Sequence, residues 1–245
     1  MWKKIAIGVV LLLILIAGAG YYLFSNLDSY IKAAIEKYGS QATQTTVNVG
    51  SVSLSLTSGA GAISGLSVAS PAGYSAPAAL ALGSIALQLD TGTLTGNGPI
   101  TVSSIALTQP RITYEVKGLG QGSNLQTIQR NVASFAGSGS AAQTPAQNGT
   151  PARKEIIRDL TITGGQVTVL APMLAAKPLI VPLPPIHLTD LGGADGATPA
   201  QIGAQVLNIV VSKAAATGAA ALTKRLGGGM VPAQAGGLLQ GLLGN

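Results

Sequence analysis

Hydrophobic and small polar residues alternate with a period of two over most of the chain after Thr46. This period is typical of strands with one apolar face. Turn signals such as Ser58-Gly59-Ala60-Gly61 and Gly96-Asn97-Gly98-Pro99 separate the alternating stretches. They predict strands near residues 47–56, 82–89, 100–107, 112–116, 155–163 and 166–170. Prolines interrupt the next apolar segment, residues 172–188, which predicts an edge strand or an irregular connection there.

Two stretches of the alternating sequence occur twice. Val49–Leu56 is similar to Leu82–Leu89, and Ile63–Pro71 is similar to Val102–Pro110. The copies begin 33 and 39 residues apart, a spacing too irregular for a solenoid. Each copy carries a pair of glycine or serine residues, which tolerate a β-bulge, and bulges bend strands. We therefore expect one β unit used repeatedly in a curved sheet.

Three segments have helical spacing instead. In residues 27–38 the apolar side chains share one face and Lys32, Glu36 and Lys37 lie on the other. We expect this helix to pack against the first strands, and the alternative is that it lies on a bilayer. A second helix is predicted after Ser123, and a third from the cap-like Thr198-Pro199-Ala200-Gln201 to about residue 226.

The N-terminus has the pattern of a membrane anchor. Met1-Trp2-Lys3-Lys4 precedes twenty uncharged residues, Ile5 to Phe24, which as a helix would span the roughly 30 Å core of a bilayer. The two lysines predict a cytoplasmic N-terminus. A cleaved signal peptide is the alternative, because Ala17-Gly18-Ala19 resembles a cleavage site. Either interpretation places the remaining chain outside the cytoplasm.

The predicted fold class is α+β and rich in β-structure: an N-terminal transmembrane helix, then a curved, mostly antiparallel sheet or groove with a few amphipathic helices. The predicted organisation is an anchor (1–24), a β-rich domain with its entry helix (25–136), a flexible linker (137–154), a continuation of the sheet (155–192), a helical segment (193–226) and a Gly/Leu-rich tail (227–245).

The amino-acid composition excludes several classes of function. Charged residues make up only 9% of the chain, against about 25% in typical soluble proteins, and aromatic residues 4%. The net charge is +6, and without Lys3 and Lys4 a difference of +4 is spread thinly over the chain. This is too dilute for a nucleic-acid interface. The absence of cysteine excludes disulfides, thiolate metal sites and cysteine nucleophiles.

Few residues offer chemistry. His187 is the only histidine, and pairing with Asp190 in a Ser-His-Asp arrangement is conceivable, but no G-x-S-x-G elbow occurs. The eight carboxylates are scattered, with no spacing typical of metal ligands or of an acid/base pair. We therefore expect no enzyme activity, no metal and no cofactor. A structural or surface role is the favoured interpretation of His187.

Two further features resemble binding motifs only weakly. Gly118-Leu119-Gly120-Gln121-Gly122 lies between a predicted strand and a helix, but it departs from both phosphate-binding patterns, and a plain turn is favoured. Arg153, Lys154 and Arg158 form a small basic cluster that could contact lipid headgroups. A solvated strand entry is the favoured interpretation.

Several segments together resemble the bacterial AsmA-like envelope proteins. They are the anchor, the short helix after it, Ile63–Tyr74, Ala79–Ile85, Asp90, Pro110–Glu115, Asn124-Leu125 and Pro185–Gly192. The resemblance covers about residues 1 to 190 and rests on degenerate β patterns. It implies an inner-membrane anchor, a periplasmic β-groove and a part in lipid traffic or outer-membrane homeostasis. The chain is much shorter than the large family members, which argues against a single-chain bridge across the periplasm.

The function predicted from the sequence is therefore that of a membrane-anchored periplasmic protein whose concave apolar face binds the acyl chains of phospholipid. The residues predicted to line this face are Val52, Leu54, Leu56, Ile85, Leu87, Leu89, Ile105 and Leu107. The same pattern also describes a sheet whose apolar face is closed by helices. The alternative function is a non-catalytic scaffold that binds envelope proteins or further copies of itself through β edges and the C-terminal tail.

Overall fold

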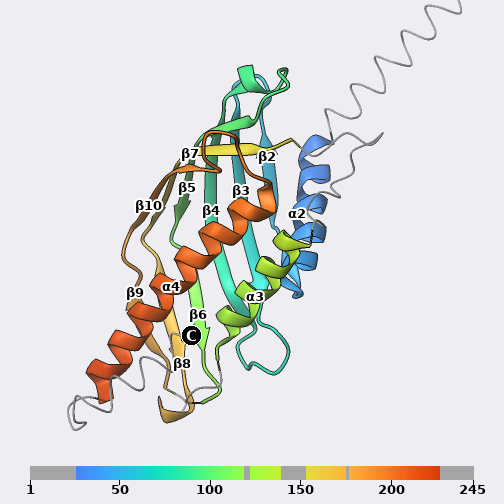
Figure 1. Cartoon of the computed structure of the whole chain (residues 1–245). Coiled ribbons are helices and arrows are strands. Elements are labelled where there is room, and N and C mark those ends of the chain that lie inside the picture. The colour runs from blue at the N-terminus through green and yellow to red at the C-terminus, as the bar shows by residue number, and fades with distance from the viewer. Residues whose placement is uncertain (1–25, 119–121, 139–152, 175–176, 227–245) are drawn as a thin grey trace, which may run out of the picture.

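A computed structural model describes residues 26–118, 122–138, 153–174 and 177–226 as an α+β fold rich in strands (Figure 1). The helices are α2 (Leu27–Thr43), α3 (Asn124–Gly137) and α4 (Pro199–Leu226), with short 3₁₀ turns at Thr91–Thr93 and Pro172–Leu174. The strands are β1 (Val47–Asn48), β2 (Ser51–Leu54), β3 (Ala60–Ala69), β4 (Ala78–Leu89), β5 (Ile100–Thr108), β6 (Arg111–Glu115), β7 (Glu155–Thr163), β8 (Gln166–Leu170), β9 (Leu179–Pro182) and β10 (Ile186–Leu191).

These ten strands form one open, mixed sheet, in which β5 and β7 pair in parallel, as do β6 and β8, and the other pairs are antiparallel. Four pairs of strands, β1/β2, β5/β6, β7/β8 and β9/β10, are single lines of chain broken in the middle. The register shows this continuity: Ser84 lies opposite Thr108, and Ala81 opposite Arg111, with no residue gained or lost between them. The sheet is therefore six long strands wide.

All six lines of strand are irregular at the same level, in what we call the crease: four are divided there into two strands, and the continuous strands β3 and β4 lack the pair between Gly65 and Gly83. It runs across the sheet through Gly50, Gly65, Gly83, Gln109–Pro110, Gly164–Gly165 and Leu183–Pro184. The backbone has a positive φ at three of these positions, +65° at Gly65, +52° at Gln109 and +65° at Gly164. At Gly50 a β-carbon would lie 2.9 Å from the Ser64 carbonyl oxygen. The sequence repeats predicted that Gly or Ser pairs tolerate a bulge. The crease passes through the glycines of three such pairs, Gly50, Gly65 and Gly83, but the register shifts lie between Val68 and Ala69 and between Gln88 and Leu89.

A strand that crosses the crease changes the parity of its inward-facing residues. In β4 the side chains of Leu80 and Leu82 face the same cleft as those of Ile85 and Leu87, across an interval of three residues at Gly83. A second break lies further along, where Gln88 is opposite Ser104 but Leu89 is opposite Val102. It matches the serine pair in the second repeat. Such breaks bend strands, which curves the sheet toward α3 and α4.

Helices α3 and α4 lie together on one face of the sheet (Figure 1). Their contact with β6 and β8 forms the tightest part of the core. Tyr114 and Val169 are 1% exposed, and a β-carbon on Gly218 of α4 would lie 3.0 Å from Cγ2 of Val169. Small residues in the C-terminal half of α4, including Ala214, Ala215 and Ala219, allow this close approach.

Both covering helices begin with the caps that their sequences suggest. The Ser123 hydroxyl accepts from the Gln126 backbone N–H and the Gln126 side chain accepts from the Ser123 N–H. Thr198 and Gln201 form the same reciprocal pair at the start of α4, at 3.0 and 3.3 Å. The buried Asn124 side chain fastens α3 to β6, because it accepts from the Glu115 N–H and donates to the Thr113 carbonyl.

Helix α2 covers the β1/β2 edge of the sheet. The carboxylates of Asp28 and Glu36 and the hydroxyl of Ser40 accept backbone N–H groups from Leu54, Val49 and Val47, each at 2.9 Å. Lys32 donates to the Gly50 carbonyl. The predicted packing against the first strands is confirmed. The expectation that Lys32 and Glu36 point away from the strands is wrong, because edge strands leave backbone groups that polar side chains satisfy.

The opposite edge belongs to β9 and β10, in the proline-rich segment predicted as an edge strand. Among the described residues, one helix, Pro199–Arg225 within α4, is long and apolar enough to cross a membrane, and it packs here against α3 and the sheet. The predicted anchor (1–24), most of the predicted linker (139–152 of 137–154) and the tail (227–245) lie outside the described residues.

The crease predicts a test at Gly65. Gly65→Ala forces a side chain into a positive-φ conformation that costs about 1–2 kcal/mol, so we expect the free energy of unfolding to fall by that amount. Urea denaturation measures it. The control is Gly98→Ala, because a β-carbon at Gly98 has nothing within 4 Å and no positive φ is present. Equal effects of the two substitutions would contradict a structural role for the crease.

Candidate functional site

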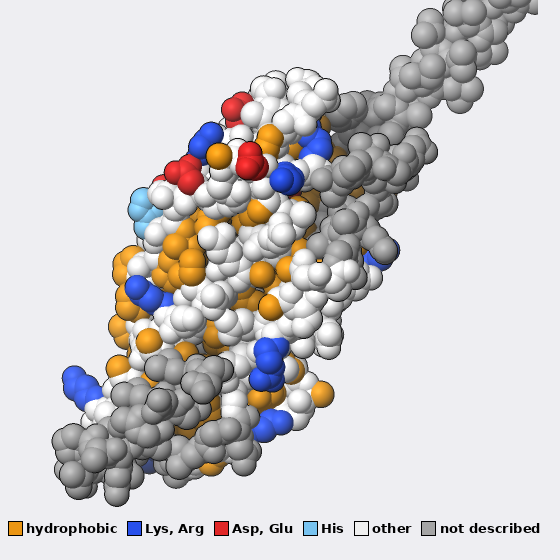
Figure 2. All heavy atoms as spheres, viewed as in Figure 1, with side chains coloured by type: hydrophobic (Ala, Val, Ile, Leu, Met, Phe, Trp, Pro, Cys, Tyr) orange, Lys and Arg blue, Asp and Glu red, His pale blue; other side chains and the backbone are white. Residues whose placement is uncertain are grey.

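An apolar cleft lies between the N-terminal half of α4 and the sheet. Its volume is about 400 Å³, within the ~300–1,000 Å³ range of small-ligand sites. The sheet contributes Ile63, Leu80, Leu82, Ile85, Leu87, Ile105, Leu107, Pro110, Ile112, Glu155, Ile157, Leu160 and Ile162, and α4 contributes Pro199, Ile202, Gly203, Val206, Leu207 and Val210. Hydrophobic side chains are visible beside α4, toward the β10 edge of the sheet (Figure 2).

The cleft exists because α4 approaches the sheet closely at one end only. Around Gly218 and Ala214 the helix touches β6 and β8, whereas around Gly203 a β-carbon would meet nothing within 4 Å. Residues Leu82, Ile85, Leu87 and Ile105 of the opposing wall are only half-buried. A void with apolar walls on both sides is what an apolar ligand segment fills.

The structure brings together half of the residues predicted to face lipid. Ile85, Leu87, Ile105 and Leu107 line the cleft from β4 and β5. Leu89 packs against the core instead. Val52 and Leu54 lie in the edge strand β2, outside the cleft lining. Leu56 lies in the turn after β2 and is 37% exposed, so its expected place in a strand is wrong.

Sequence reasoning missed the α4 wall and the β7 wall of the cleft. The helix at 198–226 was predicted, but its spacing alone does not tell which apolar residues touch a sheet and which face a void. In β7 the inward residues are Ile157, then Leu160 and Ile162, so the alternation breaks between them. One sequence feature could have indicated that β7 lines an unusual site: Glu155 is a charged residue two positions before Ile157, on the same face of the strand.

Glu155 is the one charged side chain in the cleft lining. It is the first residue of β7, and its backbone N–H donates to the Ala197 carbonyl at 2.8 Å, beside the start of α4. Burial among apolar groups raises the pKa of its carboxyl group above the ordinary value, because the charged form loses its hydration. Among the described residues, no side chain or backbone group donates a hydrogen bond to this carboxyl group.

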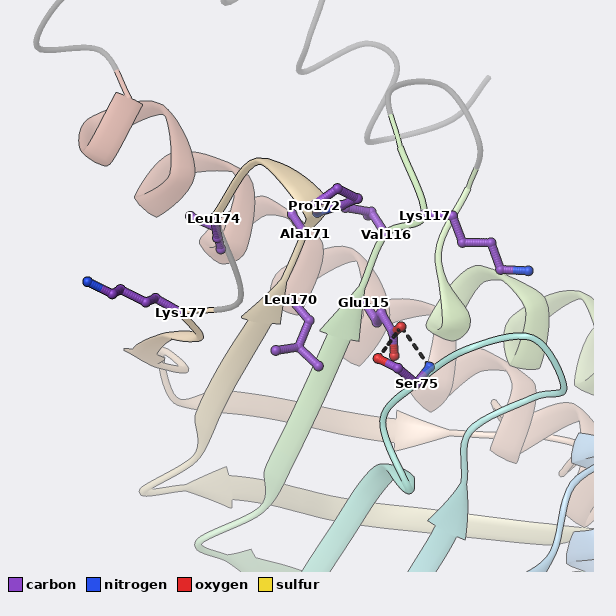
Figure 3. Close-up of a pocket in the computed structure, with 9 residues that line it drawn as sticks. All are labelled: Ser75, Glu115, Val116, Lys117, Leu170, Ala171, Pro172, Leu174 and Lys177. Atoms are coloured by element: carbon purple, nitrogen blue, oxygen red, sulfur yellow. Dashed lines mark hydrogen bonds between the residues drawn. The ribbon is translucent and has the colours of Figure 1, made fainter.

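A second pocket, of about 520 Å³, lies at the far ends of β6 and β8 (Figure 3). Its carboxylate, Glu115, is 8% exposed and accepts from the Ser75 N–H and hydroxyl and from the Ala76 N–H at 2.7–2.8 Å. Burial alone would raise the pKa of Glu115, but these hydrogen bonds and nearby Lys117 lower it overall. Glu115 thus fastens the β3–β4 connection to β6.

The two lysines of this pocket do not converge on a ligand. Lys117 and Lys177 point to opposite sides in Figure 3, and the Lys117 ammonium lies 4.5 Å from the centre of the Tyr74 ring. With its carboxylate fully hydrogen-bonded and its lysines apart, this pocket is a weaker candidate than the cleft.

His187 lies on the surface, as the sequence suggested, but its partner differs from the one considered. Its Nε2 lies 2.5 Å from a carboxylate oxygen of Asp159, and Asp190 pairs instead with Arg158 at 3.1 Å. All four side chains are at least 42% exposed. Within the described residues, no group of three histidines or carboxylates is placed to hold a metal ion.

The basic cluster proves to be divided. Arg153 is not a solvated strand entry, because its guanidinium donates to the carbonyls of Thr93, Leu94 and Gly98 at 2.6–3.2 Å and fixes the β4–β5 connection. Lys154 is exposed. Of the predicted glycine-rich loop, Gly118 and Gly122 are described and 119–121 lie outside the described residues.

Comparison of the chain with protein-family models, curated proteins and solved structures finds no match. A function for this chain is therefore argued from the cleft itself.

The raised pKa of Glu155 predicts a pH-dependent stability difference. The folded state holds this proton more tightly than the unfolded state, so the group's contribution to the free energy of unfolding falls as pH rises from the unfolded pKa, about 4.3, through the folded pKa. We expect Glu155→Gln to gain stability relative to the parent protein over this window. Urea denaturation between pH 4 and pH 8 measures the difference.

Glu115→Gln is the matched comparison, since the folded pKa of Glu115 is lowered. Its carboxylate stabilises the fold above the unfolded pKa, and this contribution is lost as pH falls through the folded pKa. Glu115→Gln should therefore lose stability most at neutral pH. Two variants with the same pH dependence would contradict this assignment.

Proposed function

We propose that the cleft binds an acyl chain of phospholipid or of a related amphiphile. The observation that carries the proposal is a cleft of about 400 Å³ whose walls are apolar apart from Glu155 and whose lining residues from β4 and β5 are only half-buried. Burying a methylene group gains about 0.8 kcal/mol, so ten methylenes gain roughly 8 kcal/mol before the losses of binding. Such a chain would cover surface that is otherwise exposed to water.

In this proposal the protein is an anchored, non-enzymatic periplasmic component of lipid handling or outer-membrane homeostasis, as the resemblance to AsmA-like proteins implies. The apolar run at residues 5–24 supports an anchor beside a bilayer, the source of the ligand. A scaffold acting through the β1/β2 edge has less support, because α2 already satisfies backbone groups of this edge.

Site-specific photocrosslinking tests the proposal. The full chain is reconstituted in vesicles of phosphatidylethanolamine and phosphatidylglycerol with a diazirine amino acid in place of Leu207, which lines the cleft, or of Ile180, which is 62% exposed on β9. We expect a lipid adduct, detected by mass, at least ten times more abundant at Leu207. Equal adducts at the two positions would indicate contact with bulk lipid only.

A substitution that fills the cleft should reduce lipid binding, and it provides the second test of the proposal. A leucine at Gly203 projects into open space between α4 and the sheet, and removing a helical glycine stabilises the helix by about 0.5–1 kcal/mol. We expect Gly203→Leu to reduce the Leu207 adduct at least tenfold without loss of folding stability. Ser212→Leu, on the exposed side of α4, should leave it unchanged. An undiminished adduct in Gly203→Leu would overturn the proposal.

A further inference from the structure

The eight carboxylates of the chain differ in whether another group of the protein binds them, and this difference bears on the chemistry of the ligand. Six have a partner inside the protein: Asp28 and Glu36 bind the sheet edge, Asp90 accepts from the Gly92 N–H, Glu115 holds the β3–β4 connection, and Asp159 and Asp190 pair with His187 and Arg158. Asp195 is exposed in a loop. Glu155 is the one that stands in an apolar wall without a partner among the described residues.

The position of Glu155 marks one end of the cleft. The Glu155 backbone lies beside the segment that leads into α4, because its N–H and carbonyl pair with Ala197. A β-carbon on Gly192 would lie 2.5 Å from the Glu155 carbonyl oxygen and 3.4 Å from Cδ1 of Ile202. The other end is formed by Ile112 and Val210, which are 1% and 9% exposed. A ligand in this cleft therefore meets apolar surface along its length and a carboxyl group at one end.

Glu155 is not needed to cap α4. The Gln201 N–H is satisfied by the Thr198 hydroxyl, and Pro199 has no N–H to donate. No charged side chain occurs in β5, or in α4 before Lys213. Lys154 and Asp195 are both exposed, and Arg153 is held by the 93–98 carbonyls. Arg158 pairs with Asp190, and Asp159 pairs with His187. The carboxyl group thus has no structural partner to explain its place.

We propose that Glu155 receives the ammonium group of the ligand's polar head, so that the cleft prefers amphiphiles with a primary amine over those with an anionic or uncharged head. This inference rests on the proposed function and names the ligand class for the same cleft. An ammonium donates charge-assisted hydrogen bonds to a carboxylate, which are the stronger kind, whereas a phosphate or carboxylate near Glu155 is repelled. Burial makes an unpaired Glu155 carboxylate costly, and an ammonium removes that cost.

The test uses the crosslinking system with the full chain and equal amounts of phosphatidylethanolamine, which bears an ammonium, and phosphatidylglycerol, which does not. The measurement is the ratio of the two lipids in the Leu207 adduct at pH 7.5. We expect at least a fivefold excess of phosphatidylethanolamine. Glu155→Gln should bring the ratio near one, and Glu155→Lys should reverse it. Asp195→Asn, an exposed carboxylate in the neighbouring loop, should leave the fivefold excess intact.

The outcomes separate the two proposals. If the adduct at Leu207 is absent in every variant, the proposed function fails and this inference fails with it. If the adduct forms but Glu155→Gln keeps the same lipid ratio, the cleft binds lipid and the headgroup assignment alone is overturned. Lowering the pH should also reduce the excess of phosphatidylethanolamine in the parent protein, because a protonated carboxyl group no longer attracts an ammonium. The lipid ratio of Glu155→Gln should not change with pH. A purely structural role for Glu155 would leave the ratio unaffected.

Discussion

The constraint on which this fold depends is that six strands must break at the same level. A strand keeps its apolar face on one side only while its residues alternate strictly, and each break shifts that alternation by one residue. If one strand alone were broken, part of its apolar residues would turn to solvent. Because the breaks at Gly65, Gly83 and Gln109 lie side by side, the whole sheet bends as a unit and its inner face stays apolar on both sides of the crease.

The crease and α4 together determine which part of the interior is closely packed and which part forms the cleft. On the far side of the crease, α3 and the alanine-rich half of α4 close onto β6 and β8, and side chains such as Tyr114 and Leu125 are fully buried. At the crease and on its near side, larger residues such as Val206 and Leu207 face a wall that has curved away, and the cleft extends across the crease to Leu80, Leu82 and Ile112. A straight helix on a bent sheet cannot follow both halves, and the space left over is the cleft.

Much of the fold was predictable because its signals are local. Alternation placed most of the strands, including the interruption at Gly164-Gly165, whereas β3 was indicated only by the similarity of Ile63–Pro71 to Val102–Pro110. Helical spacing after Ser123 and the cap-like start at Thr198 gave the starts of both covering helices. The cleft was predictable only in part, since β4 and β5 supplied Ile85, Leu87, Ile105 and Leu107. Its other wall depends on which helix lies over which strand, and that choice is made by contacts between residues about a hundred positions apart. Likewise, the sequence shows Glu155 two positions before Ile157 on one face of a strand, but no local pattern shows that its carboxyl group lacks a partner.

The way α2 replaces a missing strand limits the size of the sheet. Its bonding residues, Asp28, Lys32, Glu36 and Ser40, recur every four positions, a rise of about 6.0 Å per step. Their partners are unevenly spaced along the edge, at Leu54, Gly50, Val49 and Val47. From Asp28 to Ser40 the helix rises about 18 Å, whereas the edge from Leu54 to Val47 is about 24 Å long when fully extended, so the two rows differ by about 6 Å over four contacts. A helix can therefore seal only a short edge, and the brevity of β1 and β2 is the geometric condition under which this sheet ends in a helix rather than in another strand.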